Sequence, residues 1–382
     1  MNTDAADTKR FPRITDEMVA AMRARIGERL KDPHVAWITE ATLDNCRHYA
    51  FGVGDDNPLW WDPEYAQTTP YGDVIGIPTM LFSCSPGGLG LTGMPGIHAM
   101  FAGCDFTWYE NIRRNDPIQS AAFIKDIREK KTSFAGRAIQ QIHHIDFFTP
   151  SRGKIAECDL WNFRTDRDEA REKGQKYDRT KDPRTCYSRQ QMDEFLSLYE
   201  NEYVRGAQPL YWEDVTEGER LPTIAKGPMT VSGFIAYVQG WGGIYIRAHK
   251  LYYKQIKKLP ALAIYDDYGV PDSPEAVHWR DDFARMVGAP GPYDYGSERC
   301  SWMAHLVTNW MGDLGFLHRL QVKVRWHNAI GDLLYLRGNV TRKWRDQAAG
   351  YVDIALEARN QDDQLSADGS ATVRLPSSLS QR

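Results

Sequence analysis

Apolar residues along this sequence recur at two different spacings. Between Met303 and Trp310 they return every three or four positions, which predicts the buried face of a long helix packed on a sheet. In the stretches that follow they alternate with polar residues, and this spacing predicts strands with one buried face. Three strands are predicted in this way, at residues 320–326, 352–356 and 371–375.

The first part of the chain has the same order of elements. Thr42 and Thr230 each precede a short stretch with one apolar face, and a threonine at such a position caps a helix. Strand-like alternation appears again at residues 118–124 and 155–163. Short helix, loop, longer helical stretch and antiparallel strands therefore occur twice. This order predicts an α+β protein in which a curved sheet wraps round a long helix in each copy.

The segment that follows each short helix also repeats. The segment from Asn57 aligns without a gap on the segment from Glu275, at a constant offset of 218 positions, since 275 − 57 = 218. Trp61 then aligns with Trp279. Because the flanking elements repeat as well, we interpret the pattern as an internal duplication.

A charged stretch separates the two copies. Residues 164–190 lack apolar periodicity, which is typical of a linker, and Met192, Phe195 and Tyr199 then have helical spacing. The 12 Trp and 19 Tyr favour an extensive interface between domains or subunits, and we expect a homodimer or larger homo-oligomer. The predicted units are an N-terminal domain over residues 1–165, a linker with a short helix over 166–209, and a C-terminal domain over 210–382.

Charge and cysteine content exclude several classes of partner. A formal net charge of −4 gives no reason to expect binding to nucleic acid. No apolar run is long enough to cross a bilayer, and the first 13 residues lack the apolar core of a secretory signal. Six scattered cysteines without a C-x-x-C pair are typical of reduced thiols. We therefore expect a cytoplasmic protein, and we expect no metal because no ligand spacing such as H-E-x-x-H is present.

Residues 49–66, YAFGVGDDNPLWWDPEYA, resemble the signature of the MaoC-like (R)-specific enoyl-CoA hydratases and dehydratases. Gly54, Asp55 and Asn57 match that signature, whereas Trp60 stands where the family has a histidine. The first half as a whole is similar to the N-terminal dehydratase domain, of fatty-acid-synthase type, that double hot-dog members contain.

The second half resembles the same family at residues 276–296, with His278 at the family's histidine position. The resemblance implies two tandem hot-dog domains that form a pseudo-dimer, each an antiparallel sheet wrapped round a long helix. It also implies a hydratase or dehydratase that interconverts a 2-enoyl thioester and a 3-hydroxyacyl thioester. The acyl group is carried by coenzyme A or by an acyl carrier protein, and no cofactor is implied beyond the coenzyme A of the substrate.

The resemblance assigns proton transfer to His278, which alone restores the family's histidine in either copy. Its carboxylate partner is expected in the stretch before it, where Asp272 is favoured and Asp266–Asp267 is the alternative. Asp55 is a further catalytic candidate, including across the domain interface. The alternative for Asp55 and Asn57 is structural, because such side chains stabilise a tight turn by bonding to nearby backbone.

The resemblance also assigns residues to substrate binding. In relatives whose first copy has lost its histidine, that copy forms the pocket for the acyl tail, which gives this role to Asn57 and Trp60. Gly296 stands where the family has a glycine that lets the substrate carbonyl reach backbone N–H groups; the alternative is a helix-start glycine with unusual backbone angles. Tyr293 and Tyr295 depart from the family at this place, which suggests a bulky polar substrate or an inactive copy.

Two functions are consistent with these residues. The first is a hydratase or dehydratase acting on an enoyl thioester. The alternative is a non-catalytic acyl-thioester-binding subunit of a larger hydratase complex, because each copy lacks part of the motif. A thioesterase fits less well, since the Asn-Pro-x-His layout is that of the hydratases.

Overall fold

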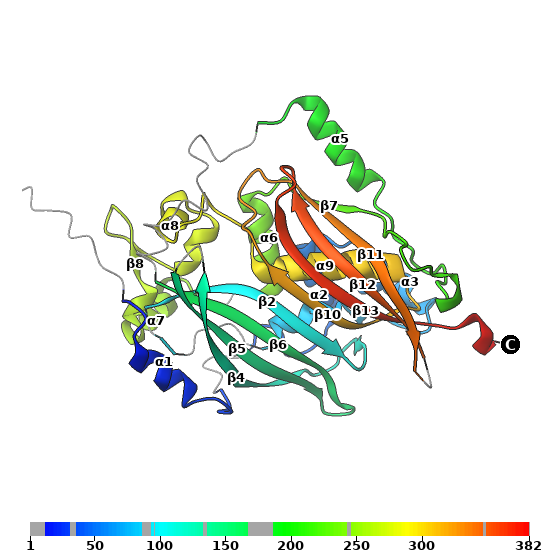
Figure 1. Cartoon of the computed structure of the whole chain (residues 1–382), viewed down its shortest axis with the longest axis horizontal. Helices are drawn as coiled ribbons and strands as arrows, with labels where there is room; N and C mark the ends of the chain where they lie inside the picture. The colour runs from blue at the N-terminus through cyan, green and yellow to red at the C-terminus, as the bar shows by residue number, and fades with distance from the viewer. Residues whose placement is uncertain are drawn as a thin grey trace, which may run out of the picture.

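Within the residues that the structure describes, nine antiparallel strands form one sheet that spans both halves of the chain (Figure 1). The computed structural model describes residues 12–30, 36–85, 93–94, 96–132, 136–166, 186–242, 246–346 and 349–381. In spatial order the strands are β4 (Gln119–Thr132), β5 (Gly136–Thr149), β6 (Gly153–Thr165), β2 (His98–Trp108), β10 (Phe316–Val324), β13 (Leu365–Leu375), β12 (Gly350–Asn360), β11 (Leu334–Arg345) and β7 (Ile224–Lys226).

The two halves of the sheet join where β2 pairs with β10. In that pairing Leu320 lies opposite Phe106 and Val322 lies opposite Cys104, so apolar side chains meet on the buried face. Strand β12 shows the alternation that the sequence predicts, because every second residue is buried and those between are partly exposed. The predicted α+β class and the antiparallel strands are confirmed.

The long helix α9 is the centre of the core. Its residues from 297 to 311 are all buried, and it contacts strands of both halves, β2 as well as β10 to β13. Figure 1 shows α9 lying against the strands of the second half. The α-helices of the described residues are α1 (Asp16–Arg23), α2 (Leu43–Val53), α3 (Pro63–Gln67), α5 (Arg189–Glu200), α6 (Val231–Trp241), α7 (His249–Lys258), α8 (Asp281–Met286) and α9 (Gly296–Met311).

The helices α2 and α6 are related copies that pack against each other. Thr42 and Thr230 cap them as predicted, each accepting a hydrogen bond from the backbone N–H three residues later. Both helices end at a glycine in the left-handed conformation, Gly54 and Gly242, which lacks the Cβ that would be strained there. The offset at both ends is 188, since 230 − 42 = 188 and 242 − 54 = 188.

Beyond these helices the structural repeat continues at the larger offset. Ile75 pairs with the strand β3 (Ile112–Arg113), and Tyr293, which lies 218 positions after Ile75, pairs with Ala329. The change from 188 to 218 reflects an insertion of 30 residues in the second copy, between α6 and the repeated motif.

The longer helix expected in the first copy is not formed by its described part. The 3-10 helix η2 (Pro78–Ser83) starts 218 positions before α9, since 296 − 78 = 218, and residues 86–92 and 95 lie outside the described residues. Within the described residues, α9 contacts strands of both halves of the sheet.

The linker prediction is confirmed for its short helix, α5, in which Phe195 is buried. Most of the charged stretch, residues 167–185, lies outside the described residues, and the domain boundaries stay predictions. In the part of the chain that the structure describes, no helix combines the length and the apolar character needed to span a membrane.

A close backbone approach between β10 and β13 generates a stability prediction. Gly369 lies opposite Val322, and a Cβ at Gly369 would lie 2.0 Å from the backbone oxygen of Gln321. We expect Gly369→Ala to lower the free energy of unfolding by about 1–3 kcal/mol, because the strands must separate. The exposed neighbour Ser370→Ala should stay within about 0.5 kcal/mol of wild type in the same urea titration. Equal midpoints for the two variants would contradict the prediction.

Candidate active site

His278 ends a short 3-10 helix, η7 (Pro274–His278), that is formed by the second copy of the motif. Ser273 caps η7 by accepting a hydrogen bond from the backbone N–H of Glu275. His278 is buried, and its ring stacks on that of Tyr295 with the ring centroids 3.8 Å apart. Because Tyr295 directly precedes α9, His278 lies at the N-terminal end of the long helix.

The hydrogen bonding of His278 defines which ring nitrogen is a base. Its Nδ1 lies 2.6 Å from the backbone oxygen of Tyr293, and since a carbonyl oxygen only accepts, Nδ1 carries the proton. The other nitrogen, Nε2, keeps its lone pair and lies 3.9 Å from Oε2 of Glu275. Burial lowers the pKa of His278 to about 4 and raises the pKa of the Glu275 carboxyl to about 7. The histidine is therefore an uncharged base that faces a carboxyl group holding its proton up to neutral pH.

The carboxylates predicted from the sequence bind elsewhere. Asp272, at the end of β9 (Pro271–Asp272), accepts a hydrogen bond of 2.7 Å from the backbone N–H of Ser273. It also lies 3.9 Å from Nη1 of Arg280, and Asp266 lies 3.1 Å from the same nitrogen. Asp267 is exposed. Asp266 and Asp272 thus both lie near the guanidinium group of Arg280.

Glu275, the carboxylate that faces His278, is not among the residues predicted from the sequence. Two signals point to it. A 3-10 helix has three residues per turn, so positions 275 and 278 lie on one face. The repeat also aligns Glu275 with Asn57, a conspicuous residue of the first motif.

Close packing from the first half shapes the start of α9. A Cβ at Gly296 would lie 2.3 Å from Cδ1 of Phe101 in β2, so this glycine is required by a neighbouring ring and not by a left-handed backbone. Two residues earlier, Asp294 forms a buried ion pair with Arg299, whose Nε lies 2.7 Å from Oδ2. Asn328 donates a further hydrogen bond of 2.7 Å to this carboxylate. These contacts fix the loop that leads into the helix.

Aromatic rings enclose His278. The ring of Tyr293 meets it edge-on with centroids 4.7 Å apart. Tyr295 packs on Trp241 of α6, with ring centroids 5.2 Å apart. Burial also raises the pKa of the Tyr295 phenol above its ordinary range. Both tyrosines border the histidine, and their role in substrate binding stays a prediction.

In the first copy of the motif, Asp55 and Asn57 stabilise a turn. The carboxylate of Asp55 accepts hydrogen bonds of 3.1 Å from the backbone N–H of Asn57 and from Nε1 of Trp60. The side-chain oxygen of Asn57 accepts the backbone N–H of Leu59 and caps the 3-10 helix η1 (Pro58–Trp60). These bonds are the ones that the structural alternative for Asp55 and Asn57 requires.

Asp55 also belongs to a buried cluster of charged groups. Nε2 of His305, on α9, lies 3.4 Å from Asp55 and 3.0 Å from the carboxylate of Glu202. Lys226 is buried nearby and donates to the backbone oxygen of Gly54 at 2.7 Å. Burial raises the pKa of Asp55 and lowers that of Lys226. For Glu202 burial is the largest single effect and raises the pKa, but the contacts with His305, Lys226 and Asn309 together outweigh it and lower the pKa.

The two copies of the motif therefore contact different parts of α9. His305 is nine residues after Gly296, which is about 13 Å along a helix that rises 1.5 Å per residue. A pairing of Asp55 with His278 is not what the structure shows, because Asp55 faces His305 instead.

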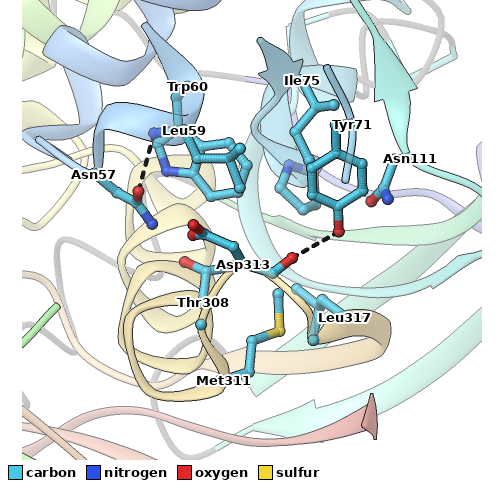
Figure 2. A pocket seen from close by; sticks show the side chains of 13 residues that line it. Asn57, Leu59, Trp60, Tyr71, Ile75, Asn111, Thr308, Met311, Asp313 and Leu317 are labelled. Atoms are coloured by element: carbon cyan, nitrogen blue, oxygen red, sulfur yellow. Dashed lines mark hydrogen bonds between the residues drawn. The ribbon is translucent and has the colours of Figure 1, made fainter. Parts of the chain in front are cut away.

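A small cavity marks the first-copy counterpart of the His278 site (Figure 2). Figure 2 shows Asn57 and Trp60 on one side of it and Asp313 between them and Tyr71. Asp313 accepts a hydrogen bond of 2.6 Å from the hydroxyl of Tyr65, and its backbone oxygen accepts one of 2.7 Å from that of Tyr71. The space is about 10 Å³, roughly one water molecule. Four of its lining residues lie 218 positions before residues at the second site: Asn57, Trp60, Ile75 and Pro78 before Glu275, His278, Tyr293 and Gly296.

Comparison with known proteins places this geometry in context. Residues 25–143 match the family model of the FAS1-like dehydratase domain region. Over 125 residues the chain is 29% identical to a UPF0336 protein of Parafrankia sp. (strain EAN1pec), and this match covers 31% of the chain and 80% of the relative.

Solved structures match nearly the whole chain. A MaoC-like dehydratase superposes with a TM-score of 0.64 at 14% identity, covering 93% of this chain and 99% of that one. A MaoC domain protein dehydratase of Chloroflexus aurantiacus J-10-fl gives 0.54 at 12% identity, covering 88% and 92%. A conserved hypothetical protein of Mycobacterium tuberculosis, described as having a double hotdog fold, gives 0.53 at 10% identity, covering 91% and 96%. The chain has the double hot-dog fold of the MaoC-like dehydratases. The fold that the resemblance implies is thereby confirmed.

One cluster in this double hot-dog protein has the atoms of a metal site, namely His144, Asp146 and Glu157 on the described part of β5 and β6. The ammonium of Lys154 already lies 2.6 Å from Asp146 and also binds Glu157. Because a lysine neutralises both carboxylates, the cluster is explained by ion pairing alone.

The bonds of Asp55 generate a test of its structural role. Asp55→Ala removes the acceptor of the Asn57 and Trp60 hydrogen bonds and one of the two carboxylates beside His305 and Lys226, and we expect it to lower the free energy of unfolding by about 3–5 kcal/mol. Asp55→Asn keeps a side-chain oxygen for the turn and should lose less. Asp56→Ala, at the exposed neighbouring position, is the control and should unfold at the same urea concentration as wild type. Wild-type stability of Asp55→Ala would rule out the structural role.

Proposed function

We propose that the chain catalyses the reversible hydration of a 2-enoyl thioester to a 3-hydroxyacyl thioester at His278 and Glu275. The observation that carries the proposal is the pair itself: an uncharged imidazole nitrogen lies 3.9 Å from a carboxyl oxygen at the N-terminal end of α9. The dehydratase region in the first half and the MaoC-like fold support this reaction class.

The proposed step moves two protons. A water molecule between the two groups loses a proton to Nε2 of His278 while its oxygen bonds to the β-carbon of the enoyl group. The π electrons of the double bond shift toward the thioester carbonyl, and the protonated carboxyl of Glu275 gives its proton to the α-carbon. A proton passes from the imidazolium back to the carboxylate to restore the starting state. Dehydration is the same sequence in reverse.

The start of α9 supplies the stabilising charge. The first N–H groups of a helix lack partners within the helix, and the helix dipole is positive at this end. A thioester carbonyl placed beside Gly296 would meet these groups as negative charge develops on its oxygen. The backbone oxygen of Tyr293 keeps the imidazole in the required tautomer by accepting a hydrogen bond from Nδ1–H.

The order of the two pKa values fits this division of roles. A base must be unprotonated and an acid protonated at the same pH, and ordinary values for histidine and glutamate give the opposite order. Burial reverses the order, with His278 at about 4 and Glu275 at about 7. The pair is therefore ready for hydration between these values.

The alternative, a non-catalytic subunit that binds an acyl thioester, is favoured by a specific observation. Asp55 and Asp272, the carboxylates expected at the two copies of the motif, are engaged by turn bonds and by Arg280. If Glu275 does not substitute for them, neither copy has a catalytic pair.

Substitution of the pair tests the proposal. We expect His278→Ala and Glu275→Gln each to lower kcat by about 10² to 10⁴, because each removes a proton-transfer group. Asp272→Asn is the matched control and should stay within about threefold, since its carboxylate binds Arg280. The measurement is the change in conjugated thioester absorbance with crotonyl-CoA, with circular dichroism to confirm folding. Full activity of His278→Ala would rule out His278 as the proton-transfer group. Inactivity of the folded wild type on carrier-bound and coenzyme A thioesters alike would favour the non-catalytic alternative.

The pH dependence offers a second test. As pH falls through about 4, His278 gains a proton and ceases to be a base; as pH rises through about 7, Glu275 loses its proton and ceases to be an acid. We expect kcat/KM for hydration to follow a bell with these two limbs. The residual activity of Glu275→Gln should lose the alkaline limb and keep the acid limb. An alkaline limb that is unchanged in Glu275→Gln assigns the acid to another group.

A further inference from the structure

The insertion of the second copy exposes an unusual number of large apolar side chains. Within the described residues these side chains are concentrated in one short stretch of the chain, between residues 246 and 270. Leu251 and Tyr253 are each more than half exposed on α7 itself. The full set in this segment is Ile246, Leu251, Tyr253, Leu259, Tyr265, Tyr268 and Val270. Large apolar side chains that are exposed in one segment point to an interaction site.

The same segment is strongly basic, although the chain as a whole has a net charge of −4. From 247 to 258 it contains one Arg and four Lys, and neither Asp nor Glu. At 100° per residue, Lys250, Lys254 and Lys257 share the outward side of α7, where each is exposed. Tyr252 and Ile256 lie on the opposite side and are partly buried. We name the outward side, with its three lysines and the flanking Leu251 and Tyr253, the α7 surface.

The α7 surface adjoins the His278 site. After α7 the chain forms a short hairpin, β8 (Ile264–Tyr265) with β9, and Ile264 packs against the apolar cluster that includes residues of η7. Arg280, two residues after His278, ties this hairpin down through Asp266. Strand β9 leads directly to the cap of η7. Figure 1 shows α7 beside β8 and below α8.

We propose that the α7 surface docks an acidic carrier protein that presents its acyl thioester to His278. This proposal rests on the proposed function and names the form in which the substrate arrives. A carrier protein with acidic side chains would meet Lys250, Lys254 and Lys257, and its apolar groups would meet Leu251 and Tyr253. Complementary charge of this kind speeds encounter and sets orientation, while the apolar contacts contribute affinity.

The shape of the α7 surface favours a protein over the other anionic partners. Small ligands such as the phosphates of coenzyme A are bound in concave sites, whereas α7 is a convex helix with no buried residue. A membrane-bound helix turns its apolar face outward into lipid. In α7 the centre of the outward face is basic, and Ile256 on the opposite face is directed toward the protein.

Direct binding tests the proposal without relying on turnover. The probe is a crotonyl-loaded acyl carrier protein labelled for fluorescence anisotropy, titrated with the full chain. Reversal of three charges, Lys250→Glu with Lys254→Glu and Lys257→Glu, should weaken binding at least about tenfold, because like charges then meet. Binding by wild type should also weaken as ionic strength rises from about 50 mM to about 300 mM.

The matched control reverses three exposed lysines on other elements: Lys130→Glu, Lys131→Glu and Lys323→Glu. It has the same net charge as the α7 variant and should bind the carrier as wild type does. If the α7 charge reversal impairs folding, the milder Lys→Gln set at the same three positions replaces it. Equal carrier binding by the α7 variant and the control overturns the proposal, as does a wild type that does not bind the carrier.

Two further measurements distinguish carrier docking from the hydratase proposal and from binding to a membrane. The ratio of kcat/KM for crotonyl-carrier to that for crotonyl-CoA should fall at least about tenfold in the α7 variant. Carrier binding without turnover of any thioester would sink the hydratase proposal and leave the docking surface standing; turnover of crotonyl-CoA without carrier binding would do the reverse. Lysine-dependent sedimentation with phosphatidylserine vesicles, in the absence of carrier binding, would overturn docking in favour of a membrane.

Discussion

In the part of the chain that the structure describes, one buried helix, α9, packs against both halves of the sheet. Its polar side chains cannot reach water, so they need hydrogen-bond or ionic partners inside the protein. Arg299 pairs with Asp294 of the loop before the helix, and His305 lies beside Asp55 and Glu202. Trp302 donates a hydrogen bond from its indole nitrogen to the backbone oxygen of Val53 in the first half. Because these buried groups must be paired, the pairing fixes the loops of both motif copies against α9.

This constraint separates the two copies of the motif. In the first copy Trp60 replaces the family's histidine, and its indole nitrogen donates to Asp55, which also faces His305. Asp55 is thereby part of a buried cluster of charged groups and is not available as a catalytic acid. In the second copy the 30-residue insertion follows α6, and Glu275 lies 3.9 Å from His278.

Burial also explains why the pKa values of His278 and Glu275 stand in the opposite order from those of free histidine and glutamate. Desolvation disfavours the charged form of each group, so the pKa of the base falls and the pKa of the acid rises. The enclosing rings of Tyr293 and Tyr295 contribute to this exclusion of water at the histidine. The departures from the family at these two positions are thus part of the environment that sets the proton affinities of the pair.

The sequence by itself determined the elements and their duplication, because these depend on local periodicity and capping. Thr42, Thr230 and the apolar face of α9 predict their helices from neighbours within a few residues. It also located His278 in the motif. Only the tertiary structure decided the partners: Asp272 binds Arg280, Glu275 faces His278, and His305 reaches Asp55 across 250 positions of chain. The pairing of His305 with Asp55 follows from how the sheet and α9 bring distant segments together, and no local pattern encodes it. Glu275 and His278 are close in sequence, but the other carboxylates near them are equally close, and only the folded chain decided which one faces the histidine.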